Sequence, residues 1–404
     1  MERLRPSLQP GFLVPALLAA TLVVDVALRW MVPVDRVSYR VWEAMRAFGA
    51  EAPFRAHARY DRPRVYGNLA AIGNVPDLRR YHRIVFTSDS LGYHNAPELA
   101  ARGGVAALLF GSSFAAGTEV NDDETLAAQL TRLTGSAVYN AAPGDPAPAR
   151  LEELADRLGM ERGVVIYEYV EGSGAPPIDA VPPDAESVRC RAMLGPWSTP
   201  AICARLTRLR QRLRISPLAV FAARAHRRVE DDRWLPNRSA DRVLRRRLVN
   251  GREMLFLAEE RGIIAQAQLS EAPVARYAAW LGARLALQHR ELLVVLVPQK
   301  YTVYGPLLER SGGAALPDDG GYVDRLEARL RERGIAVVNV TGPLRDAART
   351  ALARDTYVYW LDDTHWNAAG VRVAAEAVAP ELGRLWARQT CSESRAKDCA
   401  PRSR

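Results

Sequence analysis

The sequence has few of the residues that build metal centres. It contains only 4 cysteines and 6 histidines in 404 residues. Cys190 and Cys203 are close in sequence, as are Cys391 and Cys399, but neither pair has zinc-site spacing with nearby histidines. Ligand spacing is also missing among the histidines outside the C-terminal motif: His57, His82, His94, His226 and His289. We therefore expect neither a metal nor a cofactor.

Aromatic residues are scarce in the most basic part of the chain. The net charge is +9, and its excess is concentrated in arginines between Arg205 and Arg252, including the run Arg245-Arg246-Arg247. We expect no nucleic-acid binding, because the segment has no recognised motif and little on which bases could stack. It could contact anionic lipid or an acidic polysaccharide, although a solvated helical surface is the simpler interpretation.

Long hydrophobic runs are missing beyond the N-terminus. Residues Gly11 to Val34 approach the length of a spanning helix if Asp25 and Arg29, four residues apart, pair across one turn. No cleavage site of small residues follows closely, so we predict an uncleaved signal anchor at residues 1–34. The body would then lie in the periplasm, outside the inner membrane. In that oxidising compartment the four cysteines could form two short-range disulfides, or they could remain unpaired.

Apolar runs and amphipathic stretches alternate along the rest of the chain. The predicted strands are Ala106–Phe110, Ala137–Asn140, Val164–Tyr169, Leu292–Val297 and Ile335–Val340. The predicted helices are Glu124–Thr134, Ala149–Leu158, Val274–His289, Tyr322–Arg333 and Ala368–Arg388. This alternation predicts an α/β fold with a mostly parallel sheet covered by helices on both faces.

The same pattern suggests how the chain is divided. We expect an N-terminal extension at 35–100 that packs on a core domain at 101–390, followed by a tail at 391–404. Residues 172–270 break the strand-helix rhythm, since they open with proline-rich pieces and then become helical and basic. We interpret this segment as an insertion in the core domain.

Two segments supply the residues of a nucleophilic site. Ser113 directly follows the first predicted strand, and Asp362-Asp363-Thr364-His365 lies just before the last helix. A serine hydroxyl needs a base within hydrogen-bond reach and a third group that fixes the imidazole tautomer. Either Asp362 or Asp363 could orient His365. The alternative is a helix N-cap, with Asp363 or Thr364 capping a helix that begins near Trp366.

These motifs resemble the SGNH (GDSL-type) hydrolases. The resemblance rests on Phe110–Gly117, Val138–Gly144 and the Asp-x-His-Trp-Asn segment at Asp362–Gly370. Further stretches are similar to the alginate-type polysaccharide O-acetyltransferases: Phe86–Tyr93, Gly251–Phe256 and Val297–Tyr304. The resemblance implies a three-layer, flavodoxin-like α/β/α fold.

The resemblance also assigns roles to individual residues. Ser113 would be the nucleophile, with Ser112 in the position of the family's usual aspartate. The family's third-block asparagine is missing, since Tyr167–Gly172 stands there instead. Oxyanion donors would then be the backbone N–H groups of Ser113 and Gly144, with Asn140 nearby.

Three further residues are candidates for substrate binding. Lys300 and Tyr304 follow the fourth predicted strand and could line the site, although Lys300 could equally cap a helix end. Trp366, beside the base, could form a platform for a sugar, but packing against the loop is the favoured interpretation.

The implied activity is O-acetylation of an exported polysaccharide through a Ser113 ester. A polysaccharide esterase would use the same residues, and a non-catalytic polysaccharide-binding or assembly subunit is the alternative from another class. With one candidate span, the chain cannot carry acetyl groups across a bilayer. A multi-spanning membrane acyltransferase is therefore the expected partner.

Overall fold

The computed structural model describes the chain at residues 10–31, 53–176, 216–231, 239–258, 270–309 and 321–393, and at 178, 195, 199, 201–203, 205 and 237. Two compact units divide the chain. One comprises Met1–Ala44 with Pro183–Pro236, and the other comprises Met45–Pro182 with Asn237–Arg404. The second unit holds the central sheet and every predicted site residue.

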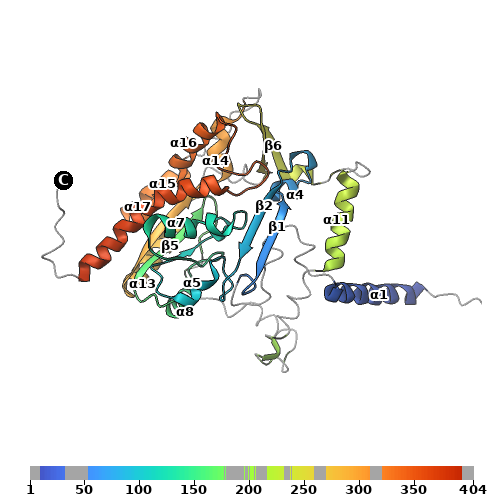
Figure 1. Cartoon of the computed structure of the whole chain (residues 1–404), viewed down its shortest axis with the longest axis horizontal. Coiled ribbons are helices and arrows are strands. Elements are labelled where there is room, and N and C mark those ends of the chain that lie inside the picture. Colours follow the sequence, from blue (N-terminus) through green and yellow to red (C-terminus); the bar gives the residue numbers. More distant parts are fainter. Residues whose placement is uncertain are drawn as a thin grey trace, which may run out of the picture. The chain divides into compact units, whose positions relative to one another are not determined.

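A five-stranded parallel sheet forms the centre of the second unit (Figure 1). Across the sheet the strands are β4 (Val138–Asn140), β3 (Ala107–Phe110), β5 (Gly163–Val170), β8 (Arg290–Val297) and β9 (Ala336–Asn339). This is the flavodoxin-like order, in which the direction of winding reverses between the first and third strands. That switch point lies between β3 and β5, so ligands are expected at the carboxyl ends of these two strands.

Helices cover both faces of the sheet. Side chains of α8 (Pro148–Arg157), α13 (Ala272–Ala286) and α15 (Tyr322–Glu332) join one core cluster with residues of the strands. The other face is packed by α17 (Ala368–Glu393), which contacts β5, β8 and β9 and lies beside α7 (Leu126–Thr134) and α16 (Thr341–Leu352). The predicted three-layer α/β/α architecture is therefore confirmed.

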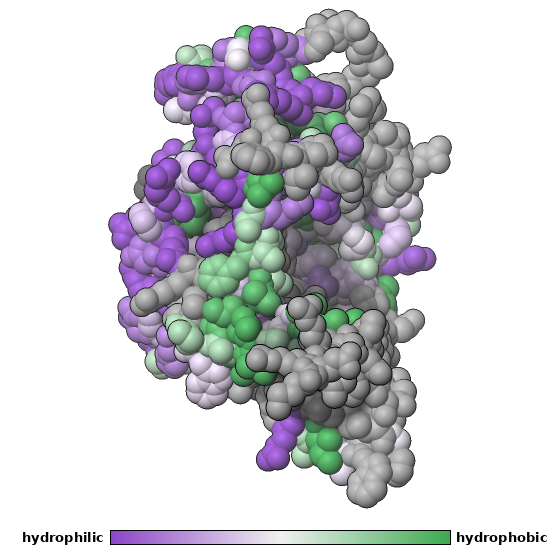
Figure 2. All heavy atoms as spheres, turned by 90° about the vertical axis from the view of Figure 1, so that its right-hand side faces the viewer, coloured by the Kyte–Doolittle hydropathy of each residue, from purple (hydrophilic) through white to green (hydrophobic). Residues whose placement is uncertain are grey.

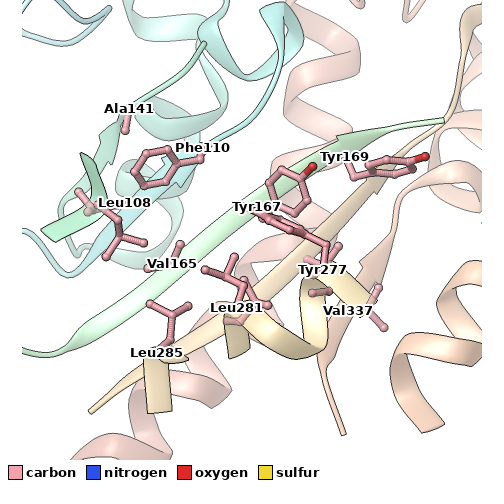
Figure 3. Close-up of a cluster of buried hydrophobic side chains, with 14 of the residues drawn as sticks. Leu108, Phe110, Ala141, Val165, Tyr167, Tyr169, Tyr277, Leu281, Leu285 and Val337 are labelled. Atoms are coloured by element: carbon pink, nitrogen blue, oxygen red, sulfur yellow. The ribbon is translucent and has the colours of Figure 1, made fainter. Parts of the chain in front are cut away.

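The two-residue repeat of the strands sorts their side chains between these layers. In β5, Val165, Tyr167 and Tyr169 belong to the cluster beneath α13, where Tyr277 packs on Tyr167 with ring centroids 5.6 Å apart (Figure 3). The intervening residue Glu168 therefore points to the opposite face. A carboxylate inside a strand that is buried along its whole length is unusual, and it marks the region next to the nucleophile.

Within residues 53–100, the described part of the N-terminal extension, β1 (Arg59–Val65) and β2 (His82–Thr87) pair as antiparallel strands. Helices α4 (Asn68–Ile72) and α5 (Pro97–Arg102) complete this segment. Gly67, just before α4, lies so close to the Asp362 backbone that an added Cβ would come within 2.1 Å of the Asp362 carbonyl oxygen. The extension is thereby joined to the loop that carries the predicted base.

The predicted helical insertion is only partly helical. It contains α11 (Pro217–Asp231), but β6 (Val243–Arg247) and β7 (Glu253–Leu257) form an antiparallel hairpin. Burial alternates along β6, with Arg246 half-buried between the exposed Arg245 and Arg247, as in a strand with one face on the protein, and Gly251 takes a positive φ of 80° in the connecting turn. The expectation of a helix through this basic stretch was wrong.

Short elements connect the larger ones. They include α6 (Ser113–Ala116), α14 (Lys300–Tyr304) and 3-10 helices at Pro76–Leu78, Asp122–Glu124, Ala240–Arg242 and Gly305–Leu307. Among the cysteines, Cys203 is disulfide-bonded. The predictions for Cys190, Cys391 and Cys399 fall outside the described side chains.

The first unit contains α1 (Pro10–Met31), whose Leu13–Met31 stretch is long and apolar enough to cross a membrane. Among the described residues it is the one helix of this kind. Hydrophobic residues gather at the surface in Figure 2, and those of α1 are largely exposed. The predicted pair forms, with Arg29 Nη2 2.7 Å from Asp25 Oδ2. Asp25 also accepts a hydrogen bond from Ser216 Oγ at 2.5 Å, which joins α1 to the start of α11.

Candidate active site

A sharp turn follows β3 and carries the candidate nucleophile. Ser112 is the N-cap of α6, and its Oγ accepts the Phe114 N–H at 3.0 Å. Ser113 is the first residue of α6 and is half-buried. The turn is tied to the loop after β4, because Gly111 and Gly144 exchange backbone hydrogen bonds of 3.0 and 2.8 Å. The serine is thus fixed at the carboxyl edge of the sheet, at the switch point.

The Asp-His motif lies on a narrow loop. An antiparallel bridge joins Tyr359 to Trp366, and Trp360 N–H donates to the His365 carbonyl oxygen at 3.2 Å. The helix after the loop is capped by Asn367, whose Oδ1 accepts the N–H groups of Ala369 and Gly370 at 3.0 and 3.1 Å. The cap is therefore one turn later than the alternative interpretation expected, which leaves the motif itself free for another role.

The structure brings the serine, the histidine and one aspartate into a continuous chain. Ser113 Oγ lies 2.7 Å from His365 Nε2. His365 Nδ1 lies 2.6 Å from Asp363 Oδ1, which also accepts the His365 backbone N–H at 2.9 Å. With Asp363 accepting the Nδ1–H, Nε2 is left unprotonated toward the serine and can take its proton.

Burial and hydrogen bonding act in opposite directions on Asp363. Burial raises the pKa of this carboxyl, but the imidazole of His365 and the backbone N–H groups of Asn68 and His365 offset burial and hold the pKa below its usual range. A carboxylate that stays ionised can keep the imidazole in one tautomer and stabilise the imidazolium that forms on proton transfer.

Asp362 has a different task. Its Oδ2 accepts the N–H groups of Gly67 at 2.9 Å and Arg80 at 2.7 Å, and the structure places it against the N-terminal extension rather than the imidazole. Burial raises the pKa of this carboxyl, in contrast to its neighbour. Of the two aspartates that the sequence left open, Asp363 is the one that contacts His365.

The extension also reaches the motif through Asn68. Its backbone N–H donates to Asp363 Oδ2, its Nδ2 donates to Thr364 Oγ1 at 2.8 Å, and its Oδ1 accepts the Thr364 N–H at 3.0 Å. Sequence reasoning missed Asn68, because no motif surrounds it and its contacts are made across nearly three hundred residues. The site is therefore built from three distant parts of the chain.

Two of the three expected oxyanion donors are engaged elsewhere. The Gly144 N–H donates to the Gly111 carbonyl oxygen, and Asn140 Nδ2 donates to the Ala115 carbonyl oxygen at 3.1 Å. These two residues brace the turn, so assigning them to the oxyanion was wrong. The Ser113 N–H has no hydrogen-bond partner within the described ranges and is the remaining candidate donor.

The three residues expected to bind substrate are buried in the protein. Lys300 is fully buried, and its Nζ donates to the carbonyl oxygens of Leu255 at 2.7 Å, Trp360 at 2.6 Å and Asp363 at 2.8 Å. Tyr304 accepts the Val358 N–H at 2.9 Å. The sequence had suggested that Lys300 and Tyr304 line the site. Instead, both side chains hydrogen-bond to the backbone of the segment that carries the Asp-His motif.

Trp366 is likewise a packing residue. It is 1% exposed, its ring meets Phe114 edge to face at a centroid distance of 5.5 Å, and its Nε1 donates to the Phe114 carbonyl oxygen at 3.3 Å. This contact joins the serine turn to the histidine loop. A sugar platform at this position is excluded by burial, and the packing interpretation holds.

Two acidic residues near the site have no counterpart in the sequence predictions. The Glu168 carboxylate contacts the serine turn, with Ser112 N–H donating to Oε2 at 2.6 Å. Glu119 is buried, and one of its carboxylate oxygens lies within 4.8 Å of ligand atoms of Asp363 and His365. Glu119, Asp363 and His365 form a group that could hold a cation, but Asp363 and His365 are hydrogen-bonded to each other.

Part of the chain is similar to a known protein family. Residues 249–399 match the SGNH hydrolase-like domain of the acetyltransferase AlgX. The predicted resemblance is confirmed. The matched segment includes the Asp-His loop, whereas Ser113 lies before it. A curated protein from Pseudomonas putida, "Probable alginate O-acetylase AlgJ", is 30% identical over 105 residues. That alignment covers 26% of this chain, and the chain spans 26% of the length of that protein.

Two solved structures align with most of this chain at low sequence identity. A protein from Slackia heliotrinireducens described as an SGNH hydrolase is 13% identical, with a TM-score of 0.34, covering 70% of this chain and 100% of that chain. An extracellular lipase from Streptomyces rimosus is 10% identical, with a TM-score of 0.30 and coverage of 70% and 100%.

Proposed function

We propose that this protein is a membrane-anchored O-acyltransferase that acetylates an exported polysaccharide through an ester on Ser113. The observation that carries the proposal is the hydrogen-bonded chain from Ser113 Oγ through His365 to Asp363. The AlgX-type match and the AlgJ relative support the acetyltransferase class. The apolar helix α1 supports an anchor, which would leave the body in the periplasm.

In this mechanism each residue has a defined step. Ser113 Oγ attacks the acyl carbonyl carbon while His365 Nε2 takes the hydroxyl proton, and the Ser113 N–H donates to the oxygen that becomes negative. When this tetrahedral intermediate collapses, the alcohol of the acyl donor leaves with a proton from His365, and the acyl group remains on Ser113. A polysaccharide hydroxyl then gives its proton to His365 and attacks the ester, which regenerates the serine.

We expect this enzyme to be slow and to receive its acetyl groups from another protein. Losing one oxyanion donor costs about 2.7–4 kcal/mol of transition-state stabilisation, and Gly144 and Asn140 are both engaged elsewhere. One apolar helix cannot move acetyl groups across a bilayer, so a multi-spanning membrane acyltransferase would deliver them from the cytoplasmic side.

Acyl transfer can be separated from hydrolysis with a model donor. Purified protein is incubated with p-nitrophenyl acetate, with and without a soluble oligosaccharide acceptor, and both p-nitrophenol release and acetate on the sugar are measured. A transferase is expected to acetylate the sugar and to release p-nitrophenol faster when the acceptor is present. Release with no acetylated sugar would identify an esterase. Release no faster than with Ser113→Ala would contradict acyl chemistry at this serine.

The non-catalytic alternative relies on the arginines between Arg205 and Arg252 as a glycan-binding surface. Within the described part of that segment, Arg245 is paired with Asp77 at 2.7 Å and with Glu253 at 2.5 Å. These carboxylates offset part of the positive charge that would attract an acidic polymer. Among the described residues of that segment no contact specifically favours the binding role, so acyl transfer remains the proposal.

A further inference from the structure

A buried carboxyl group lies directly beneath the serine turn. Glu168 is 2% exposed and sits near the carboxyl end of β5, on the strand next to β3. Its Oε2 accepts the Ser112 N–H at 2.6 Å, and Ser112 Oγ lies within hydrogen-bond distance of Oε1 at 3.3 Å. The Ala115 N–H faces the same carboxyl. One side chain therefore contacts residues on both sides of Ser113.

The turn is shaped around this group. At Gly111, an added Cβ would meet Glu168 Oε2 at 2.3 Å and Glu168 Cβ at 2.7 Å. Only a residue without a side chain allows the glutamate to reach the Ser112 N–H. A buried backbone N–H that loses its acceptor is costly, so the conformation of the turn depends on this carboxyl.

The nucleophile is held by the same backbone. Ser113 Oγ lies 2.7 Å from His365 Nε2, and a shift of about 1 Å in reacting groups can cost about a hundredfold in rate. Ser112 and Ala115 bracket the serine, and both contact Glu168. We infer that Glu168 is a positioning residue: its carboxyl group anchors the turn that presents Ser113 to His365. The inference rests on the proposed acyl-transfer function.

The pairing also explains why a hydroxyl is suited to position 112. A carboxylate there would face the Glu168 carboxylate, since Ser112 Oγ is already 3.3 Å from Oε1. Two carboxylates at such a distance cannot both ionise readily. Ser112 instead donates its hydroxyl hydrogen to Glu168 and accepts the Phe114 N–H. The single acid of this turn is therefore supplied from the neighbouring strand.

Burial raises the pKa of Glu168 to about 7, and the hydrogen bonds from Ser112 and Ala115 oppose that rise. Asp145, on the loop after β4, raises it further by charge repulsion. Tyr167 is the titratable neighbour along the strand. Because the folded protein holds this proton more tightly than the unfolded chain, the contribution of Glu168 to stability is complete below about pH 4.5 and is lost as the pH rises toward about 7.

The first test compares Glu168→Ala with Glu168→Gln. Alanine removes the acceptor of the Ser112 N–H, so kcat for p-nitrophenyl acetate should fall by about tenfold to a hundredfold with little change in KM. Glutamine keeps an acceptor, and should retain kcat within about threefold while abolishing the decrease in unfolding stability between pH 4.5 and 7. Equal kcat losses in both variants, or a full kcat in Glu168→Ala, would overturn the inference.

The matched control is Glu171→Ala. Glu171 is also buried at the end of this strand, but its Oε2 accepts the Gln299 N–H at 2.9 Å and Thr302 Oγ1 at 2.6 Å, away from the serine turn. Its replacement should lower the melting temperature without the kcat loss of Glu168→Ala. A kcat loss as large as that of Glu168→Ala would assign the effect to general destabilisation and contradict a positioning role.

Reciprocal rescue provides the decisive comparison. Ser112→Asp should lower the melting temperature and kcat by placing a second carboxylate against Glu168, and adding Glu168→Gln should restore both. Additive losses in the double variant would overturn the pairing. The melting temperatures test the pairing of Ser112 with Glu168 without any enzymatic assay. Full activity in Ser113→Ala would instead show that the proposed function is wrong, so the two failures can be told apart.

Discussion

Ser113→Ala and His365→Ala are each expected to lower kcat for p-nitrophenyl acetate by about a thousandfold or more. Alanine at 113 removes the atom that lies 2.7 Å from His365 Nε2, and alanine at 365 removes the base. Ser113 is half-buried, so Ser113→Ala should keep a melting temperature close to wild type. His365→Ala takes the imidazole away from the buried Asp363 carboxylate, so a decrease in melting temperature is expected for that variant. Stopped-time assays of p-nitrophenol release, together with thermal unfolding, measure both quantities.

Ser90→Ala is the control for this pair, because Ser90 is exposed. It should hydrolyse the ester at the wild-type rate. A Ser113→Ala protein that is folded and as fast as Ser90→Ala would show that the nucleophile is another residue. The double variant should be no slower than either single one, since residues that act as a unit are not additive.

Replacement by asparagine is expected to abolish most of the activity at Asp363 but to change it little at Asp362. Asp363→Asn should lower kcat by about ten-thousandfold, because an amide at this position favours the wrong imidazole tautomer. Asp362→Asn should stay within about threefold of wild type. Its Oδ2 accepts the Gly67 and Arg80 N–H groups, and an amide oxygen can do the same, while Oδ1 has no partner among the described residues.

Asp362→Ala completes this comparison. It removes the acceptor of the buried Gly67 N–H and of the part-buried Arg80 N–H, and a buried N–H left without an acceptor costs about 1–3 kcal/mol. Its melting temperature should therefore fall while the activity of the protein that remains folded is retained. If Asp362→Asn were the slower of the two asparagine variants, the assignment of Asp363 as the partner of His365 would be wrong.

The sheet and most of its helices could be predicted from the sequence. Hydrophobic runs placed all five parallel strands to within about two residues, because the strands are mostly apolar and all but the edge strand β9 are buried almost throughout. The β6–β7 hairpin was not recognised. Its arginines suggested a solvated helix, and the sequence Val243-Leu244-Arg245-Arg246-Arg247 has no two-residue alternation, so only the glycine of the turn, Gly251, pointed to a hairpin.

The site was partly readable as well. Short-range spacing placed Asp362 and Asp363 within reach of His365 without choosing between them, and register placed Ser113 at the strand end. Lys300 was misassigned, since a lysine at the carboxyl edge of the sheet is indistinguishable by position from one turned inward to backbone carbonyls. Asn68 and Glu168 could not be found, because their roles arise from contacts with residues far away in sequence.

The most direct test of acyl chemistry at this site is to identify the residue that becomes covalently modified. Wild-type protein and His365→Ala are treated with a serine-directed fluorophosphonate, digested and sequenced by tandem mass spectrometry. We expect the adduct on Ser113 in the wild type and little or none in His365→Ala, because the hydroxyl is activated through Nε2. An adduct on Ser112, or equal labelling of Ser113 in both proteins, would contradict a Ser113–His365–Asp363 mechanism.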